Sequence, residues 1–205
     1  MTQAGTPLQL LAERLPLERR PWQEGFGESP DPQAAVLVAL TDEVAPKVLL
    51  GRRAAHLALH PGEVAFAGGK REAEDNSPWH TALREAQEEV GLTPESCKPL
   101  GELSPLLTRT GFQVYPCIGA VPKGLDIVLD PGEFDSVFMP QLAVFARPEL
   151  FELQTLTAGK HTRTVPSYRI EGDHIWGVTA AILAQLVNVA YDAGFDLQRD
   201  WNVKP

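Results

Sequence analysis

Three glutamates near the middle of the chain are spaced so that one helix could present them together. Residues 84–92 read Arg-Glu-Ala-Gln-Glu-Glu-Val-Gly-Leu. Because each residue of an α-helix turns by about 100°, Glu85, Glu88 and Glu89 would fall within an arc of about 100°. Carboxylate oxygens suit Mg²⁺ or Mn²⁺, and a small set of protein ligands leaves room for water and a substrate phosphate. The spacing therefore indicates a divalent-metal site.

This arrangement carries a local cost that metal binding would explain. Glu85 and Glu89 are like charges four residues apart, which costs roughly 0.2–0.5 kcal/mol. Glu88 and Glu89 also lie in the last helical turn, where the helix dipole disfavours anions by about 0.3–1 kcal/mol. Arg84 can offset part of this cost by pairing with Glu88, and a bound cation would offset more. The alternative is an ordinary solvated face of charged residues.

The elements on either side could hold these carboxylates against a ligand. Ser77 is a good N-cap, Pro78 fits the first helical position, and Gly91 predicts the helix end. Gly68 and Gly69 follow a short strand and precede this helix, and we expect them in a loop where backbone can approach a ligand closely. A strand, a glycine loop and a carboxylate helix together predict a pocket with metal at one wall.

The remaining pattern predicts a mixed sheet with helices packed on it, because strands and helices alternate without a βαβ rhythm. Leu8, Leu11 and Leu15 indicate a short amphipathic helix near the N-terminus. We expect residues 1–33 to form an arm, 34–191 the domain and 192–205 a tail. Strands are expected at 34–40, 47–50, 64–66, 112–121, 165–170 and 175–176, and a second long helix at 178–191.

Composition restricts the classes of partner. The 205 residues are 43% apolar and 22% charged, as in one ordinary globular domain. The net charge of −9, with no basic cluster beyond short pairs such as Arg52-Arg53, argues against a nucleic-acid partner. No apolar run reaches the ~18 residues that span a bilayer, and residues 1–20 lack a signal-peptide pattern. We expect a cytoplasmic protein that does not bind membranes; the arm and tail could serve a homodimer, although nothing in them requires one.

The carboxylate segment, with the residues before it, resembles the signature of a known family. Gly69, five residues, Asp75, eight residues and then the segment from Arg84 resemble the Nudix box. Asp75 stands where the family has Glu, and one extra residue precedes Arg84. The resemblance implies an α/β fold, a Nudix-type α/β/α sandwich with a mixed sheet. It also implies Mg²⁺-dependent hydrolysis of a diphosphate linkage in a small nucleotide-containing molecule.

Residue roles follow from the same resemblance. It implies that Glu85 and Glu89 bind metal, and that Glu88 is a third ligand or the base that activates water. Arg84 would orient these carboxylates; the alternative is a plain surface ion pair. Two further residues, Glu133 and Arg53, are assigned to the site; the alternative for each is an ordinary solvated surface residue. Glu133 would be a base or additional ligand from a loop, and Arg53 would meet a substrate phosphate. Gly68 and Gly69 would bind the substrate through their backbone.

A longer stretch, residues 49–69, resembles the coenzyme A diphosphatase branch of the family. The matching positions are Leu49, Leu50, Arg53, Ala54, Gly62, Phe66, Gly68 and Gly69. Gly51, Ala58 and Ala67 depart from the branch pattern, and Ala58 removes an arginine suited to phosphate recognition. Coenzyme A or a derivative is thus the first expected substrate, and ADP-ribose or a dinucleotide cofactor is the alternative. A non-hydrolytic nucleotide-binding sensor is the rival of another class, against which the three intact glutamates argue.

Overall fold

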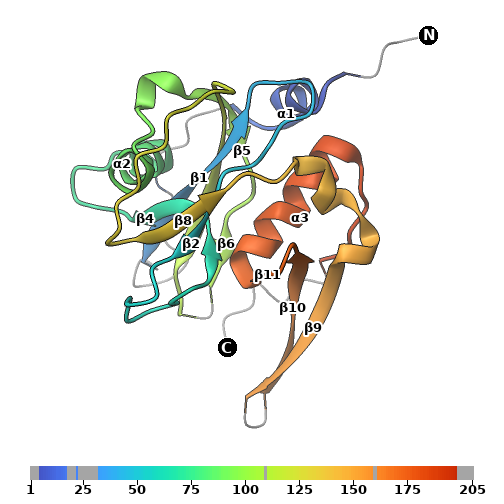
Figure 1. The fold of residues 1–205 in the computed structure, drawn as a ribbon. Coiled ribbons are helices and arrows are strands. Elements are labelled where there is room, and N and C mark those ends of the chain that lie inside the picture. The colour runs from blue at the N-terminus through green and yellow to red at the C-terminus, as the bar shows by residue number, and fades with distance from the viewer. Residues whose placement is uncertain (1–4, 18–21, 23–31, 109, 159–160, 198–205) are drawn as a thin grey trace.

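The central sheet of the molecule is mixed, as expected. The computed structural model describes residues 5–17, 22, 32–108, 110–158 and 161–197 of the 205-residue chain. Its largest sheet has the strand order β4-β1-β7-β5, with β6 also paired to β7 (Figure 1). Strands β1 and β7 run parallel, whereas the other pairs are antiparallel. The strands are β1 (Gln33–Thr41), β4 (Ala67–Lys70), β5 (Lys98–Glu102), β6 (Leu106–Leu107) and β7 (Gln113–Val121).

Two smaller antiparallel sheets complete the strand layer. One has the order β3-β2-β8 and the other β11-β10-β9. Figure 1 shows the hairpin of β9 and β10 reaching away from the body of the molecule. The bounds are β2 (Leu50–Arg53), β3 (Val64–Ala65), β8 (Phe134–Phe138), β9 (Phe151–Ala158), β10 (His161–Ile170) and β11 (Asp173–Trp176).

The strand predicted at 47–50 is displaced toward the C-terminus, because its pairing partners lie far away in the sequence. Only Leu50 of that range belongs to β2, which pairs with β3 and β8. Lys47 and Val48 instead make isolated bridges to Gln141 and Leu40. Strands β4, β5, β6, β8 and β9 were not predicted.

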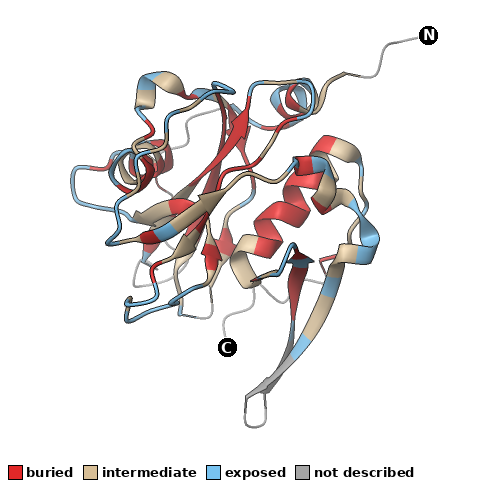
Figure 2. Ribbon diagram, in the orientation of Figure 1, coloured by how far each residue is buried: buried red, intermediate tan, exposed pale blue. Residues whose placement is uncertain are grey.

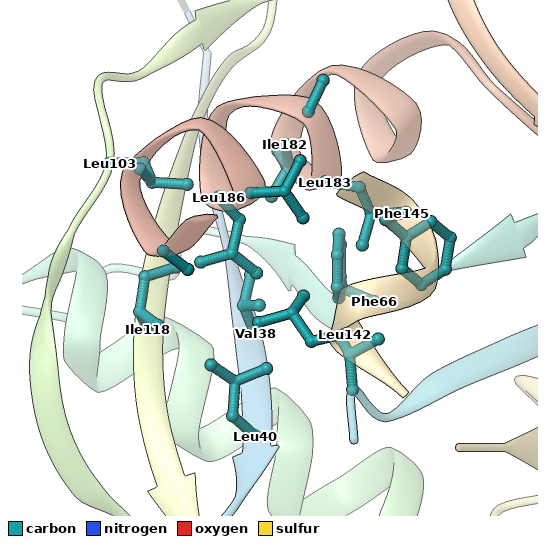
Figure 3. Close-up of a cluster of buried hydrophobic side chains, with 14 of the residues drawn as sticks. Val38, Leu40, Phe66, Leu103, Ile118, Leu142, Phe145, Ile182, Leu183 and Leu186 are labelled. Atoms are coloured by element: carbon teal, nitrogen blue, oxygen red, sulfur yellow. The ribbon is translucent and has the colours of Figure 1, made fainter. Parts of the chain in front are cut away.

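Helices cover the central sheet on both sides, as the continuous burial of β1 from Leu37 to Thr41 requires (Figure 2). Ala35, Leu37 and Ala39 pack in one hydrophobic cluster with helix α2 (Pro78–Val90). Val38 and Leu40 belong to a second cluster, built around helix α3 (Gly177–Tyr191) (Figure 3). Short 3₁₀ helices connect the strands: η1 (Pro94–Ser96), η2 (Leu142–Ala146) and η3 (Pro148–Leu150).

The short N-terminal helix exists and packs into the core. Helix α1 (Pro7–Arg14) begins with a capping box at Thr6 and buries Leu8 and Leu11 in the α3 cluster. Arg14 binds Asp192, just beyond α3, at 2.7 Å. Most of 18–31 lies outside the described residues, but Trp22 is described and buried. The predicted boundary between an arm and the domain remains a prediction.

The chain after α3 is described as far as Leu197. Phe195 stacks on Phe151 with ring centroids 4.4 Å apart, and its backbone is bound by both ends of the Asn188 amide. The rest of the predicted tail, 198–205, lies outside the described residues. Within the described chain, no helix is long and apolar enough to cross a bilayer.

Candidate active site

Helix α2 forms where the sequence predicts it. The Ser77 hydroxyl accepts a hydrogen bond from the His80 N–H at 3.2 Å, and Gly91 ends the helix with a φ of 70°. The apolar face packs on the central sheet, and the carboxylate-bearing face lies along β4, the edge strand of that sheet. On that face Glu89 is buried, Glu85 is partly buried and Glu88 is exposed.

Gly68 and Gly69 lie inside β4 rather than in a loop, which corrects the prediction. They pair with Val36 and Ala35 of β1, a partner strand that the local sequence does not reveal. A Cβ on Gly68 would lie 2.6 Å from the Val36 Cα, and a Cβ on Gly69 would collide with the Glu85 carboxylate. The two glycines therefore allow this strand to lie directly beneath the carboxylates of α2.

Glu89 is the most strongly perturbed carboxylate of the group. Burial raises its pKa to about 8, against the hydrogen bond from the Gly68 N–H, while the charges of Glu85 and Glu133 raise it further. The Gly68 nitrogen lies 2.9 Å from the Glu89 Oε2, and Arg53 also favours the ionised form. The carboxylates that act on Glu89 outnumber the one arginine that does so, and a divalent cation would supply further positive charge.

Arg84 connects the carboxylates around it. Its guanidinium donates to Glu85 at 3.0 Å, to Glu88 at 3.2 Å and to the backbone carbonyl of Lys70 at 3.2 Å. Burial raises the pKa of Glu85, and the neighbouring Arg84 opposes that rise. These contacts fix where two of the three glutamates point, and the orienting role of Arg84 stays a prediction.

The buried carboxylate of Asp75 binds the Arg84 guanidinium. Its side chain is 1% exposed and accepts from Arg84 Nη2 at 3.1 Å, from the Thr81 hydroxyl at 2.6 Å and from the Glu72 N–H at 2.9 Å. Burial opposes ionisation, but these hydrogen bonds outweigh it and lower the pKa of Asp75 to about 2. Asp75 is therefore a fixed anion that holds the guanidinium in place.

Arg53 and Glu133, 80 residues apart, are brought together at one end of the β2–β8 pair. Arg53 Nη2 lies 3.5 Å from Glu133 Oε2, and the Glu133 carbonyl accepts from the Ala54 N–H. Both charges act on Glu89. The Arg53 Nε is buried and has no hydrogen-bond partner among the described residues. Ala58, in the loop after β2, is exposed.

The donor set fits a magnesium-type cation, although the ligands are not already gathered around a point. Among the residues that the structure describes, no three His, Cys, Asp or Glu side chains form a ready metal cluster. Glu85 and Glu88 are held by Arg84, and Glu89 by the Gly68 N–H. All of the candidate donors are carboxylate oxygens, the type that Mg²⁺ and Mn²⁺ prefer.

Two residues of this network were not predicted. Thr81 carries no motif signal, and only its place between Asp75 and Arg84 on the first turn of α2 could have suggested it. Trp22 contacts the Asp75 backbone from a segment read as an arm. A lone tryptophan in a Pro- and Gly-rich stretch was the available signal, since such a large apolar side chain is usually buried.

Comparison with known proteins agrees with this architecture. The NUDIX domain model matches residues 31–160. NudL of Yersinia enterocolitica, an uncharacterized Nudix hydrolase, is 36% identical over 193 residues, which cover 92% of this chain and 97% of that protein. NudL of Pectobacterium atrosepticum is 40% identical over 155 residues, or 75% and 80% of the two chains. A MutT/nudix family protein from Enterococcus faecalis shares the fold, with a TM-score of 0.54 at 18% identity, over 83% of this chain and 66% of that one.

Proposed function

Because this chain belongs to the Nudix family of hydrolases, which cleave diphosphate linkages, we propose that it does so with Mg²⁺ or Mn²⁺ and acts on coenzyme A or a derivative. The observation that carries the metal proposal is the buried Glu89, held by the Gly68 N–H and repelled by Glu85 and Glu133. A buried carboxylate in such a place is stabilised by a cation and is otherwise costly.

The protein's own groups orient the reaction. Arg84 holds Glu85 and Glu88 in place, and the Gly68 N–H holds Glu89, so each proposed ligand has a defined orientation before a metal gathers them. A bound divalent ion lowers the pKa of water and neutralises charge on the phosphoryl oxygens.

Arg53 and Glu133 lie where they could serve the substrate and the water. The unpartnered Nε of Arg53, as far as the described residues show, can donate to a phosphate oxygen. Glu88 and Glu133 are both partly accessible, and either can accept the proton of the attacking water. The water oxygen bonds to one phosphorus and the bond from that phosphorus to the bridging oxygen breaks, which yields two phosphate products.

Coenzyme A is proposed from the branch-like residues of 49–69, of which Leu50 and Arg53 lie on β2 and Gly68 and Gly69 on β4. Ala58 is the observation that favours the alternative substrates, ADP-ribose or a dinucleotide cofactor, because an exposed alanine offers no charge to the extra phosphate of coenzyme A. A nucleotide-binding sensor is the third candidate, but simple binding has no need of three adjacent glutamates.

The test is chromatography of coenzyme A, ADP-ribose and NADH after incubation with the protein and Mg²⁺ or Mn²⁺. We expect adenosine 3′,5′-bisphosphate and phosphopantetheine from coenzyme A, and no products in the presence of a chelator. Cleavage of another compound alone would retain the hydrolase and reject coenzyme A. Binding without cleavage of any compound would favour the sensor.

A further inference from the structure

Trp22 is a buried residue outside the range that the family model matches. Its side chain is 7% exposed, and its indole N–H donates to the backbone carbonyl of Asp75 at 3.0 Å. The ring meets Tyr115 edge to face, with centroids 5.1 Å apart, and the Arg71 guanidinium lies over the indole at 5.2 Å from the ring centroid. Contacts with β7 and with the loop after β4 thus fix the indole in one orientation.

The indole N–H matters for the site because its acceptor is the backbone of Asp75, the residue that binds Arg84. A buried tryptophan usually finds an acceptor, so the bond by itself would be ordinary. Here the acceptor belongs to Asp75, whose carboxylate binds Arg84 through two nitrogens, Nε at 3.4 Å and Nη2 at 3.1 Å. Arg84 in turn holds Glu85 and Glu88. Three contacts therefore connect Trp22 to the carboxylates of α2.

The other donor to the same carbonyl is weaker. Arg71 Nε approaches the Asp75 oxygen at 3.4 Å, while Arg71 Nη1 binds the Gln33 amide oxygen at 2.9 Å. A hydrogen bond at 3.4 Å lies beyond the usual range for N–H···O, whereas 3.0 Å lies within it. Loss of the indole N–H would leave the carbonyl oxygen of Asp75 with only the longer hydrogen bond from Arg71.

We propose that Trp22 is a positioning residue of the active site, which holds the Asp75–Arg84 pair so that Glu85 and Glu88 are correctly placed. The proposal rests on the proposed function only in taking those glutamates as metal ligands. It extends the machinery of the site into the segment before residue 31, where the match to the family model begins.

Trp22→Phe keeps an aromatic ring and removes the N–H donor, and Trp176→Phe makes the same change in a partly buried residue at the end of β11. We expect Trp22→Phe to weaken Mn²⁺ binding about 3- to 10-fold, the effect of one lost hydrogen bond. Calorimetry of the substrate-free protein measures this. We expect kcat at limiting Mn²⁺ to fall in proportion while KM for the nucleotide stays unchanged, and Trp176→Phe to match wild type in both.

A second variant and a second readout separate positioning from simple packing. Benzothienylalanine at position 22 keeps the fused rings and removes only the donor, so it should reproduce the Mn²⁺ effect with a smaller fall in melting temperature than Trp22→Phe. In metal-free protein, hydrogen exchange across residues 70–84 should accelerate in both position-22 variants and stay at the wild-type rate in Trp176→Phe.

Wild-type Mn²⁺ affinity together with wild-type exchange across 70–84 in the position-22 variants would overturn the proposal. If the wild-type protein itself binds no Mn²⁺, the metal-dependent function fails instead. The exchange measurement then decides the role of Trp22, because it needs no metal and no substrate.

Discussion

Glu89 is buried beside other carboxylates. A neutral replacement should separate its effect on turnover from its effect on stability. Glu89→Gln keeps the shape and an acceptor for the Gly68 N–H. We expect turnover to fall at least ~100-fold because metal-borne charge stabilisation is lost. We also expect no loss of thermal stability without metal, since a buried amide costs less than a buried carboxylate. Steady-state kinetics and thermal melts measure both.

Glu95 provides the matched control, because it is an exposed glutamate on η1 with no role in the site. Glu95→Gln should behave as wild type in both assays. Near-normal turnover in Glu89→Gln would exclude Glu89 as a metal ligand.

Asp75 should make the protein sensitive to acid. Its pKa lies near 2 in the folded protein against an ordinary value of 3.8. Because the folded pKa is lowered, the stabilisation is complete above about pH 5 and is lost as the pH falls toward 2; a shift of this size corresponds to about 2 kcal/mol. Asp75→Asn should therefore be destabilised by at least this amount at pH 7, and its difference from wild type should narrow at pH 3.

Urea unfolding of both proteins at the two pH values measures this difference. Asp126→Asn is the control, since Asp126 takes part in none of the contacts that hold Arg84. A gap between Asp75→Asn and wild type that stays constant from pH 7 to pH 3 would contradict the assigned anion.

Single residues were predictable as far as their local spacing carried the signal. The carboxylates and Arg84 could be read from residues 84–92, because helical periodicity fixes which side chains share a face. The Arg53–Glu133 pair could be named only through the resemblance, since nothing local joins residues 80 positions apart. The burial of Glu89 was not predictable, because it depends on how closely β4 approaches α2.

The close approach of β4 to α2 depends on Gly69, which has no side chain to displace Glu85. We expect Gly69→Ala to lower activity on the order of 10- to 100-fold, because a ligand moved by about 1 Å disturbs the reacting geometry. Stability should change little, since the group that must shift is the flexible end of Glu85. Kinetics and urea unfolding measure the two effects.

Gly124→Ala is the control, because a Cβ at Gly124 would meet no atom within 4 Å. Gly69→Ala with wild-type activity would mean that Glu85 need not occupy its present position. Equal losses of activity and of stability would instead indicate that β4 itself is disrupted.

Elements were predictable where they are long and periodic. Helices α2 and α3 were found because their apolar periodicity runs over 13 and 15 residues, and Ser77 and Gly91 mark the ends of α2. Strand β1 was found as a continuous apolar run. Strand β9 has eight residues and was missed nonetheless. Strands β5, β6 and β8 have five residues or fewer, too short for a period to emerge, and β8 forms through pairing with the distant β2. Distant pairing likewise made Gly68–Gly69 part of a strand.

Over the whole molecule, one side of the central sheet carries the candidate active site and the other carries most of the apolar core. The α2 side carries the carboxylates, Arg84 and the Trp22 contact, while the α1 and α3 side is a large apolar cluster. Mixed strand order and helices on both faces were predicted from the sequence and are confirmed. The integration of α1 into that cluster was not, since an amphipathic pattern does not say what it will pack against.

This division predicts that a cavity on the α1 side changes stability and leaves the chemistry intact. Leu11 is fully buried between α1 and the α3 cluster. Leu11→Ala should lower the free energy of unfolding by about 2–5 kcal/mol, through lost burial and the cavity that remains. Turnover per folded molecule should stay at the wild-type value. Leu17→Ala, at a position 57% exposed, should change neither. Urea unfolding and kinetics below the transition measure both, and a lowered kcat in Leu11→Ala would show that the two sides of the sheet are coupled.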